Sequence, residues 1–368
     1  MRPNGTPAKK SPDEPAGGAL KRVTSISRWL ARKKAPGAVP APRVSVVIPV
    51  FNGEATLGEC LERLYQSNVG EFETVLVDDG STDRTRDIAA RFPVRVVPSG
   101  GRVGPAAARN IGAREARGDV LFFIDADVMV RPDTLSTLLA GMEREEVDGF
   151  NGVQSARMRH RNLASQYKNM WIRWTYLRQH GDVPLFYTTA AAIRRDAFLE
   201  SGGFDVGYGG PSVEDTAFGQ KLKRLGVKVR IHPELEVEHV KRYSLRSLLE
   251  TDYKRSVSLT RLKLRHPRDL GENNTSVPAS YMASIPLFGL AILLGIVGAA
   301  AGLDWVQALA VLALAGTVVL NLEFLNAIRI SDGIGRALAS TPLLWLELLV
   351  VGAGTAVGLL SYPFGRRY

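Results

Sequence analysis

The sequence predicts an α/β fold with a mostly parallel sheet, followed by a helical region that suits a membrane. Two observations lead to this prediction. Segments typical of strands alternate with segments typical of helices, and this alternation indicates a parallel sheet covered on both faces. From residue 281 onward, long stretches are nearly uncharged. We expect three regions: a basic tail (1–42), an α/β domain (43–272) and membrane-anchoring helices (273–368).

The alternation starts with a run of β-branched residues. VSVVIPV (44–50) is expected to form a buried strand. ATLGECLERLYQS (55–67) has the spacing of an amphipathic helix, and FETVLVDD (72–79) is a second strand that ends in two acids. STDRTRDIAARF (81–92) begins with good N-cap residues and is expected to form a helix.

The same pattern then repeats. VRVVPS (94–99) is predicted as a short strand, and GPAAARNIGAREARG (104–118) as a helix that ends at Gly118. DVLFFIDAD (119–127) is predicted as a strand because its first part is uniformly apolar. RPDTLSTLLAGMERE (131–145) is the next predicted helix.

Two acidic pairs stand at the ends of predicted strands. Asp78 and Asp79 end the second strand, and Asp125 and Asp127 end the fourth. Ligands of parallel sheets bind beyond the carboxyl ends of the strands, so we expect these acids at one shared edge and not in the core. Two carboxylates there suit a divalent cation such as Mg²⁺ or Mn²⁺. The alternative for Asp127 is helix N-capping or solvation in a loop.

The composition limits the possible partners. The chain has 368 residues, and its formal net charge of +10 indicates nucleic acid, a membrane surface or a phosphorylated substrate as partner. No nucleic-acid-binding motif is recognisable, which argues against the first. Cys60 is the only cysteine, so the chain has no intrachain disulfide. The tail (1–42) is expected to stay unfolded, or to form a basic amphipathic helix over residues 19–34 on an anionic membrane.

Three apolar stretches, 283–302, 305–322 and 342–364, are long enough to cross a bilayer. Buried helices of a soluble protein are the alternative. Three full crossings would place Arg366 and Arg367 on the side opposite the α/β domain, against the usual excess of basic residues in cytoplasmic loops. We therefore expect one segment to be interfacial or re-entrant.

Four segments match a known pattern in the same order. They are VSVVIPVFN, VLVDDGSTDRT, GPAAARNIGAREARGDVLFFIDADV and GGFDVGYGGPSVEDTAFGQKLKRLG, and they lie between residues 44 and 240. Together they resemble a family-2 glycosyltransferase. The resemblance implies the A-type nucleotide-sugar fold with its Rossmann-like sheet, a nucleotide-diphospho-sugar donor and a divalent cation, Mg²⁺ or Mn²⁺.

The resemblance also implies roles for individual residues. The expected nucleotide-sugar site comprises Pro49, Phe51, Glu54, Asp78, Asp79, Arg109, Asn110 and Asp125. The expected metal ligands are Asp127, Asp125 and His239. The residue types agree with these roles, because arginine binds phosphate and carboxylates bind hard cations. The plainer alternatives are a core aromatic at Phe51, a surface arginine at Arg109 and a structural histidine at His239.

The resemblance implies a catalytic base in the ED motif of VEDTAFGQKLKRLG. There Asp215 is the expected base, with Glu214 beside it. An acceptor hydroxyl must lose its proton as it attacks the anomeric carbon, and a carboxylate within hydrogen-bonding distance can take it. The alternative role of both acids is charge complementarity at a helix N-terminus.

The complete pattern predicts a membrane-anchored glycosyltransferase that transfers a sugar to a hydroxyl of a lipid or lipid-linked glycan, with inversion, as is usual in the family. We expect it in the inner cell membrane, multi-pass, with its catalytic domain in the cytoplasm. Transfer to polyprenyl phosphate and a non-catalytic membrane scaffold are the alternatives. QKLKRLG lacks the tryptophan of the QxxRW signature of processive members, which favours single transfer. The basic and aromatic segment 157–180 lies either at the membrane surface or on the sheet.

Overall fold

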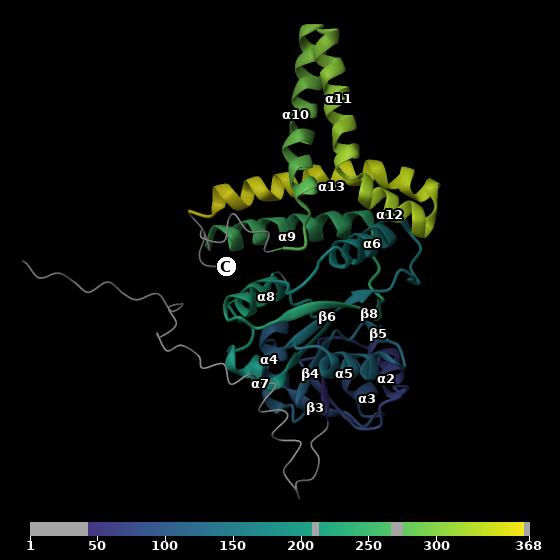
Figure 1. Cartoon of the computed structure of the whole chain (residues 1–368), viewed down its shortest axis with the longest axis vertical. Coiled ribbons are helices and arrows are strands. Elements are labelled where there is room, and N and C mark those ends of the chain that lie inside the picture. Colours follow the sequence, from purple (N-terminus) through teal and green to yellow (C-terminus); the bar gives the residue numbers. More distant parts are fainter. Residues whose placement is uncertain (1–42, 208–212, 266–274, 364–368) are drawn as a thin grey trace, which may run out of the picture. The chain divides into compact units, whose positions relative to one another are not determined.

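Figure 1 shows a computed structural model of the protein, which describes residues 43–207, 213–265 and 275–363. The predicted tail (1–42) lies outside the described residues. The strands are β1 (Val44–Val50), β2 (Phe72–Asp78), β3 (Arg95–Pro98), β4 (Val120–Ile124), β5 (Val128–Val130), β6 (Gly149–Gln154), β7 (Ala190–Arg194) and β8 (Val229–His239).

The described strands form one mixed sheet in the order β3-β2-β1-β4-β7-β6-β8-β5. Strands β3, β2, β1 and β4 pair in parallel, and so do β6 and β8. Strand β7 pairs antiparallel with β4 and β6, and β5 pairs antiparallel with β8. The predicted α/β fold with a mostly parallel sheet is therefore confirmed.

Strand β1 illustrates why an uninterrupted apolar run folds at the centre of the sheet. Its successive side chains point to opposite faces. Ile48 packs with α2 (Leu57–Tyr65) and α5 (Thr134–Arg144), whereas Val47 packs with α4 (Pro105–Glu115). Helices thus bury both faces of the strand, as a parallel sheet requires.

Two predicted elements end or begin elsewhere than expected. The strand predicted over 119–127 ends as β4 at Ile124, so the two acids that follow lie in a turn before β5. The helix predicted over 81–92 is reduced to α3 (Thr85–Ala89). Ser81 and Asp83 accept hydrogen bonds from backbone N–H groups of residues 52 and 54, so the chain stays in a loop until these contacts are made.

The remaining helices are α6 (Leu163–Leu177), α7 (Arg195–Glu200), α8 (Glu214–Arg224), α9 (Leu245–Arg265), α10 (Ala279–Ala301), α11 (Asp304–Leu320), α12 (Leu322–Asp332) and α13 (Ile334–Ser361). Within the described ranges, α10 and α13 are long and apolar enough to cross a membrane. Helices α11 and α12 pass this test only as a pair, which is bent by 59° at its break. The three predicted stretches therefore give two candidate spans, or three if the bent pair is one span.

Helix α6 packs both on the sheet and on the apolar helices. Its Trp171 ring lies 4.6 Å from the ring of Tyr281 in α10 and 4.9 Å from the ring of Phe324 in α12. The ring of Tyr167 lies 5.2 Å from that of Phe324. Helix α6 also contacts β6. The basic and aromatic segment 157–180 therefore joins the sheet to the apolar helices.

Two glycines of α13 allow it to lie directly against α9. A Cβ at Gly354 would overlap Ser256 Oγ, and a Cβ at Gly358 would lie 2.7 Å from Thr260 Cβ. Both approaches are closer than two carbon side chains tolerate. Small residues at a helix interface permit such close approach of the two backbones. The α9–α13 contact is thus encoded by the glycines of α13.

We expect Gly354→Leu to lower the free energy of unfolding by about 1–3 kcal/mol, because the added side chain pushes α13 away from α9. Gly289→Leu in α10 is the matched control, since a Cβ at Gly289 meets nothing within 4 Å. Thermal unfolding of the full chain in detergent measures both variants. Equal unfolding midpoints would contradict the close α9–α13 contact.

Candidate active site

The carboxyl ends of three parallel strands meet at one edge of the sheet. Val50 at the end of β1 lies opposite Asp78 at the end of β2, and β4 pairs with β1 on its other side. The loops after β1, β2 and β4 therefore lie side by side, and ligands of parallel sheets bind at such an edge. The predicted acids 78–79 and 125–127 all belong to it.

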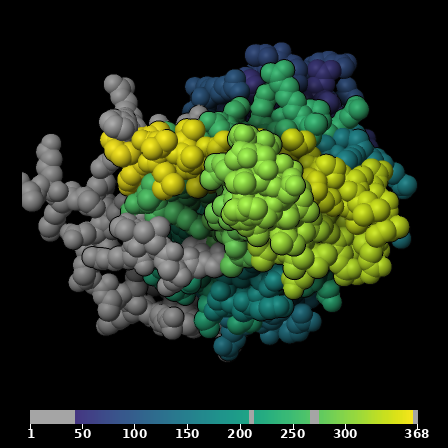
Figure 2. All heavy atoms as spheres, turned by 90° about the horizontal axis from the view of Figure 1, so that it is seen from above, coloured from purple at the N-terminus to yellow at the C-terminus, as the bar shows by residue number. Residues whose placement is uncertain are grey.

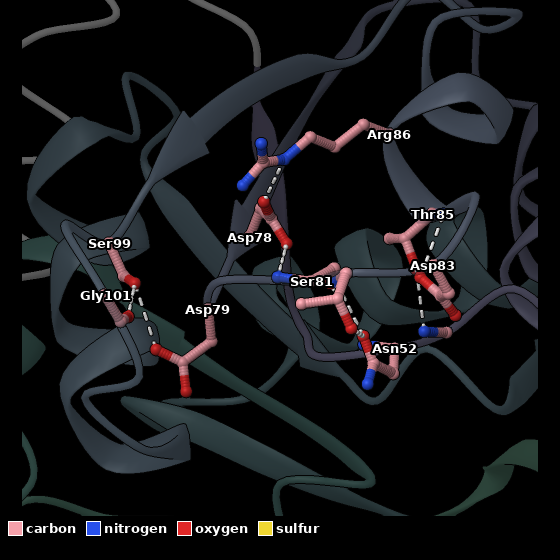
Figure 3. A network of polar contacts seen from close by, with 11 residues as sticks. Asn52, Asp78, Asp79, Ser81, Asp83, Thr85, Arg86, Ser99 and Gly101 are labelled. Atoms are coloured by element: carbon pink, nitrogen blue, oxygen red, sulfur yellow. Dashed lines mark hydrogen bonds and ion pairs between the residues drawn. The ribbon is translucent and has the colours of Figure 1, made fainter.

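Figure 3 shows how the loops after β1 and β2 hold one another. Asn52 has a left-handed backbone (φ 53°), and its Oδ1 accepts a hydrogen bond from the Thr82 N–H at 2.9 Å. The Asn52 N–H donates to Ser81 Oγ at 3.0 Å, and the Gly53 N–H donates to Thr85 Oγ1 at 2.8 Å. The two loops are thus fixed to one another before any ligand binds.

Asp78 is buried and anchors this network. Its Oδ1 accepts a hydrogen bond from the Ser81 N–H (2.9 Å), and its Oδ2 accepts one from Arg86 Nε (2.5 Å). Burial acts to raise the pKa of Asp78, but the hydrogen bonds from Ser81 and Arg86 outweigh burial and lower it. Asp78 therefore remains ionised, with both oxygens engaged inside the protein.

Asp79 holds the loop that leads into α4. Its Oδ1 accepts hydrogen bonds from the Val103 N–H (2.8 Å) and Ser99 Oγ (3.0 Å), and its Oδ2 accepts one from the Gly104 N–H (2.9 Å). Gly104 has a φ of 88°, a conformation that favours glycine. Asp79 thus sets the path of this loop along the edge of the sheet.

Phe51 and Arg102 form an exposed stack at the same edge. Arg102 Cζ lies 4.0 Å from the centroid of the Phe51 ring, which is 37% exposed. Phe51 is therefore not a core aromatic residue. An aromatic ring beside a guanidinium suits a nucleotide base and its phosphates. Sequence reasoning missed Arg102; its signal was a basic residue within the glycine-rich loop GGRVG (100–104).

Glu54 and Pro49 are the other residues expected near the base. Glu54 Oε1 accepts a hydrogen bond from Arg84 Nε at 2.8 Å, and hydrogen bonding to Arg84 lowers the pKa of Glu54. Pro49 lies within β1 opposite Val77 of β2 and is half-buried. The carboxylate of Glu54 is thus engaged in an ion pair with Arg84.

Arg109 of α4 is a buried bridge between two acidic segments. Its Nη2 donates to Asp125 Oδ1 (2.7 Å), and its Nη1 donates to Glu214 Oε1 (3.3 Å). Its guanidinium also lies 5.9 Å from the centroid of the Phe204 ring. Burial acts to lower the pKa of Arg109, but the charges of Asp125 and Glu214 outweigh burial and raise it. Arg109 is therefore not a surface arginine.

Asn110 fastens the segment that follows α7. Its Nδ2 donates to the Phe204 carbonyl (2.8 Å), and its Oδ1 accepts a hydrogen bond from the Phe204 N–H (2.9 Å). Gly203, which precedes Phe204, has a φ of 69°, and a Cβ at Gly203 would overlap Asn110 Oδ1. Consecutive residues of α4 thus hold both the segment after α7 and the start of α8.

Asp127 and His239 face each other beside the turn after β4. His239 Nε2 lies 3.2 Å from Asp127 Oδ2, and its Nδ1 lies 3.2 Å from Gln154 Nε2. Gln154 Nε2 also donates to the hydroxyl of Tyr187 at 2.7 Å. Burial acts to raise the pKa of Asp127, but the hydrogen bond from His239 and its charge outweigh burial and lower it.

These residues fit a divalent cation that binds together with a diphosphate. Asp127 and His239 supply an oxygen and a nitrogen donor, whereas Asp125 is held by Arg109. No three His, Cys, Asp or Glu side chains converge in the described part of the chain. Mg²⁺ commonly takes only one or two carboxylates and completes its shell with substrate phosphates. His239 Nε2 can bind a cation when Gln154 turns its amide oxygen toward a protonated Nδ1.

Glu214 and Asp215 occupy the first turn of α8, and their charge complements the helix N-terminus. Glu214 is buried against Arg109, whereas Asp215 is half-buried. Asp215 Oδ1 accepts a hydrogen bond from the Thr216 N–H at 2.6 Å. Because Arg109 binds both Glu214 and Asp125, it brings the ED motif to the turn that carries the other acids.

Two sequence comparisons agree with the predicted family. Residues 45–202 match the family model described as Glycosyl transferase family 2. Glycosyltransferase GlyG of Streptococcus pneumoniae serotype 4 is 33% identical over 110 residues, which cover 28% of this chain and 36% of that protein. Dodecaprenyl-phosphate galacturonate synthase of Rhizobium johnstonii is 32% identical over 128 residues, which cover 32% of this chain and 38% of that protein. The chain thus spans well under half the length of these two relatives.

Among the solved structures of similar fold is that of the mannosyltransferase PcManGT of Pyrobaculum calidifontis in complex with GDP-Man and Mn²⁺. Its TM-score is 0.54 at 20% sequence identity, over 90% of this chain and 94% of that chain. The likeness concerns the fold alone, and it confirms the predicted A-type fold.

We expect Arg109→Gln to lower the free energy of unfolding by about 3–5 kcal/mol, because it removes a buried cation that two carboxylates share. Arg114→Gln, on the exposed face of the same helix, is the matched control and should change it by less than about 0.5 kcal/mol. Denaturant unfolding of the full chain in detergent measures both. If the two variants unfold at the same denaturant concentration, the bridge does not stabilise the site.

Proposed function

We propose that this chain, a glycosyltransferase with a family-2 domain over residues 45–202, transfers one sugar from a nucleotide-diphospho-sugar to a hydroxyl of a lipid or lipid-linked glycan. The observation that carries the proposal is the Arg109 bridge from Asp125 to Glu214. Asp215 follows Glu214 directly. Asp215, the proposed base, therefore lies next to Glu214, which Arg109 joins to Asp125. Asp125 lies at the edge of the sheet where the donor is expected.

The donor is assigned to the edge of the sheet. Phe51 and Arg102 offer the exposed stack on which a base can lie, and Asp79 holds the loop that carries Arg102. Asp127 and His239 are assigned to a divalent cation, Mg²⁺ or Mn²⁺. When bound, the cation neutralises charge on the departing diphosphate. The presence of GDP-Man and Mn²⁺ in the P. calidifontis structure is consistent with these assignments.

Asp215 is assigned the role of base. Its carboxylate accepts the proton of the acceptor hydroxyl while the hydroxyl oxygen forms its bond to the anomeric carbon. The bond from that carbon to the diphosphate oxygen breaks in the same displacement. Attack from the face opposite the leaving group inverts the configuration at the anomeric carbon. The Arg109 bridge supports this role because it fixes the start of α8 against the turn after β4.

A polyprenyl-phosphate acceptor is the second candidate. It is favoured by the similarity to the R. johnstonii protein, whose name is dodecaprenyl-phosphate galacturonate synthase. A phosphate oxygen is already ionised at neutral pH and needs no base. Asp215 therefore separates the two candidates, because its removal should stop transfer to a hydroxyl and spare transfer to a phosphate.

We assign the apolar helices to a membrane. Leu293 and Ile296 of α10 and Val311 and Leu312 of α11 are each more than half exposed. Figure 2 shows helices α10 and α11 in light green beside α12 and α13 in yellow. An apolar surface of this extent is typical of a membrane interaction site. A lipid bilayer that covers these side chains would remove them from water.

The crossing element in this proposal is the α10–α11 pair, and α13 is interfacial. Figure 1 shows α9 and α13 running across the ends of α10 and α11. Helix α9 carries exposed charges, among them Arg246 and Lys254. A crossing α13 would draw α9 into the hydrocarbon, at a cost of roughly 2.5–3.5 kcal/mol for each charge at the bilayer centre. An inner-membrane location with the basic α9 on the cytoplasmic side follows the positive-inside tendency.

We expect Asp215→Asn to lower kcat for transfer to a hydroxyl about 10²–10⁴-fold, since it removes the base. Asp127→Ala should instead weaken Mn²⁺-dependent binding of the donor. Asp133→Asn is the control, because Asp133 pairs with Arg131 on the surface. Release of nucleoside diphosphate from a panel of nucleotide-sugars, with and without extracted lipids, measures all three. Full transfer to a hydroxyl by Asp215→Asn would rule out its role as base.

Spin labels at Leu312 of α11 and Leu349 of α13 test the membrane assignment, because both side chains are more than half exposed. We expect the label on Leu312→Cys to lie deeper in the bilayer than the label on Leu349→Cys. Cys60 should not react, since burial raises the pKa of its thiol to about 12. Paramagnetic relaxation by lipid-soluble and water-soluble agents measures both depths. Equal depths for the two labels would show that α13 crosses the membrane.

A further inference from the structure

A cavity of about 250 Å³ lies where α6, α9 and α13 meet. Its lining includes Tyr187 from the loop before β7 and Glu347 from α13, so it joins the sheet domain to the apolar helices. Leu259 of α9 and Leu359 of α13 contribute apolar lining. The cavity thus has one end near the sheet and a lining that continues along α9 and the interfacial helix α13.

Hydrogen bonds connect this cavity to the candidate metal ligands. The Tyr187 hydroxyl accepts a hydrogen bond from Gln154 Nε2, which also contacts His239 Nδ1, and His239 Nε2 faces Asp127. Each of these contacts is 3.2 Å or shorter. The cavity is therefore separated from Asp127 by three side chains in contact.

Electrostatics connect the cavity to Asp215 as well. Tyr176 and Arg255 both line the cavity. Burial, followed by the negative charge of Asp215, raises the pKa of Tyr176 well above its ordinary value. Burial acts to lower the pKa of Arg255, but the charge of Asp215 is the largest of the contributions that outweigh it. Asp215 thus lies within electrostatic reach of both residues.

The charges of the cavity wall favour an anionic ligand. Its lining contains three basic side chains, Lys168, Arg255 and Lys263, and two carboxylates, Asp252 and Glu347. Lys168 Nζ pairs with Asp252. Arg255 and Lys263 make no ion pair or hydrogen bond with another residue in the described ranges. Both are half-buried, and their spacing places them on one face of α9.

The wall also offers polar atoms that a ligand can bind. Asp252 Oδ2 and the hydroxyl of Tyr281 are buried, and neither forms a hydrogen bond of good geometry within the part of the chain that the structure describes, although the carboxyl group of Glu347 lies near both. Buried polar atoms are normally satisfied, because each unsatisfied one costs free energy. A ligand with hydrogen-bonding groups next to its charge would satisfy them.

We propose that this cavity binds the headgroup of a phosphate-bearing lipid, with the phosphate on Arg255 and Lys263 and the hydrocarbon chain along Leu259 and Leu359. The inference rests on the proposed function, since it makes this lipid the carrier of the acceptor hydroxyl, and the phosphate is the group that Arg255 and Lys263 bind. The headgroup then lies between the membrane helices and the segment that carries Asp215. Arg255 is a binding residue in this account, and the lipid phosphate, not a free phosphate, is its partner.

The test is equilibrium binding of radiolabelled farnesyl phosphate to the purified full chain in nanodiscs, without nucleotide-sugar or metal. We expect Arg255→Gln to weaken binding about tenfold or more, which corresponds to about 1.4 kcal/mol. Arg255→Lys should retain part of the affinity. Lys254→Gln is the matched control, since Lys254 is adjacent, exposed and outside the cavity, and it should change the affinity less than about twofold.

Three results would overturn the proposal. Competition by farnesol equal to that by farnesyl phosphate would show that the phosphate is not recognised. Inorganic phosphate competing equally well would show that the lipid chain is not recognised. Equal affinity of Arg255→Gln and wild type would remove Arg255 from the site, and equal unfolding temperatures of the two proteins exclude misfolding as the cause of a lost affinity.

The binding experiment does not depend on the proposed transfer reaction, because it contains no nucleotide-sugar. Measuring the release of nucleoside diphosphate beside it separates the two proposals. Suppose that lipid binding depends on Arg255 while no nucleotide-sugar releases nucleoside diphosphate. That result would support the lipid site and contradict the proposed function. Release of nucleoside diphosphate by Arg255→Gln at the wild-type rate without acceptor, together with lost transfer to lipid, supports both. Transfer by Arg255→Gln at the wild-type rate would sink the lipid site alone.

Discussion

Arg109 lies buried between two carboxylates that are far apart in the sequence, Asp125 after β4 and Glu214 at the start of α8. A buried arginine needs such partners, because an unpaired charge in the interior costs several kcal/mol. The pairing therefore fixes the ED motif against the turn after β4. Asp127 lies in that turn, and Asp215 follows Glu214, so one guanidinium sets the relation between the two halves of the candidate site.

Most of the fold could be predicted from the sequence, because the patterns that indicate strands and helices lie within short stretches of the chain. The β-branched run of β1 and the acids after β2 indicate a buried parallel sheet with polar side chains at its edge. The contacts of individual side chains were not predictable in this way. Arg109 was expected near the nucleotide, and its pairing with two carboxylates was not foreseen. The helix expected from residue 81 begins only at Thr85, because Ser81 accepts a hydrogen bond from the Asn52 N–H. Both partners are set by tertiary contacts that no short stretch of sequence encodes.

For the apolar helices too, the local pattern was predictable from the sequence and the contacts between distant segments were not. Hydropathy identified the apolar stretches, yet it did not tell which of them form single helices long enough to cross a membrane. The glycines of α13 matter here, because they join α13 to the charged helix α9 and thereby give it a neighbour that resists burial in lipid. Helix α6 completes the connection through Trp171 and Tyr167, which pack on α10 and α12. The cavity at α6, α9 and α13 is the place where we propose that a lipid acceptor binds.

We propose that Asp127 and Asp215 act on the same bound nucleotide-sugar, Asp127 through a cation at the diphosphate and Asp215 as the base for the acceptor hydroxyl. The most direct measurement is a structure of the full chain in nanodiscs with Mn²⁺ and a non-hydrolysable nucleotide-sugar. The account predicts the cation on Asp127 and His239, the diphosphate beside it, and the anomeric carbon facing Asp215 with room for one acceptor oxygen. A sugar that faces away from Asp215, or an Asp215 that opens into a separate cavity, would contradict it.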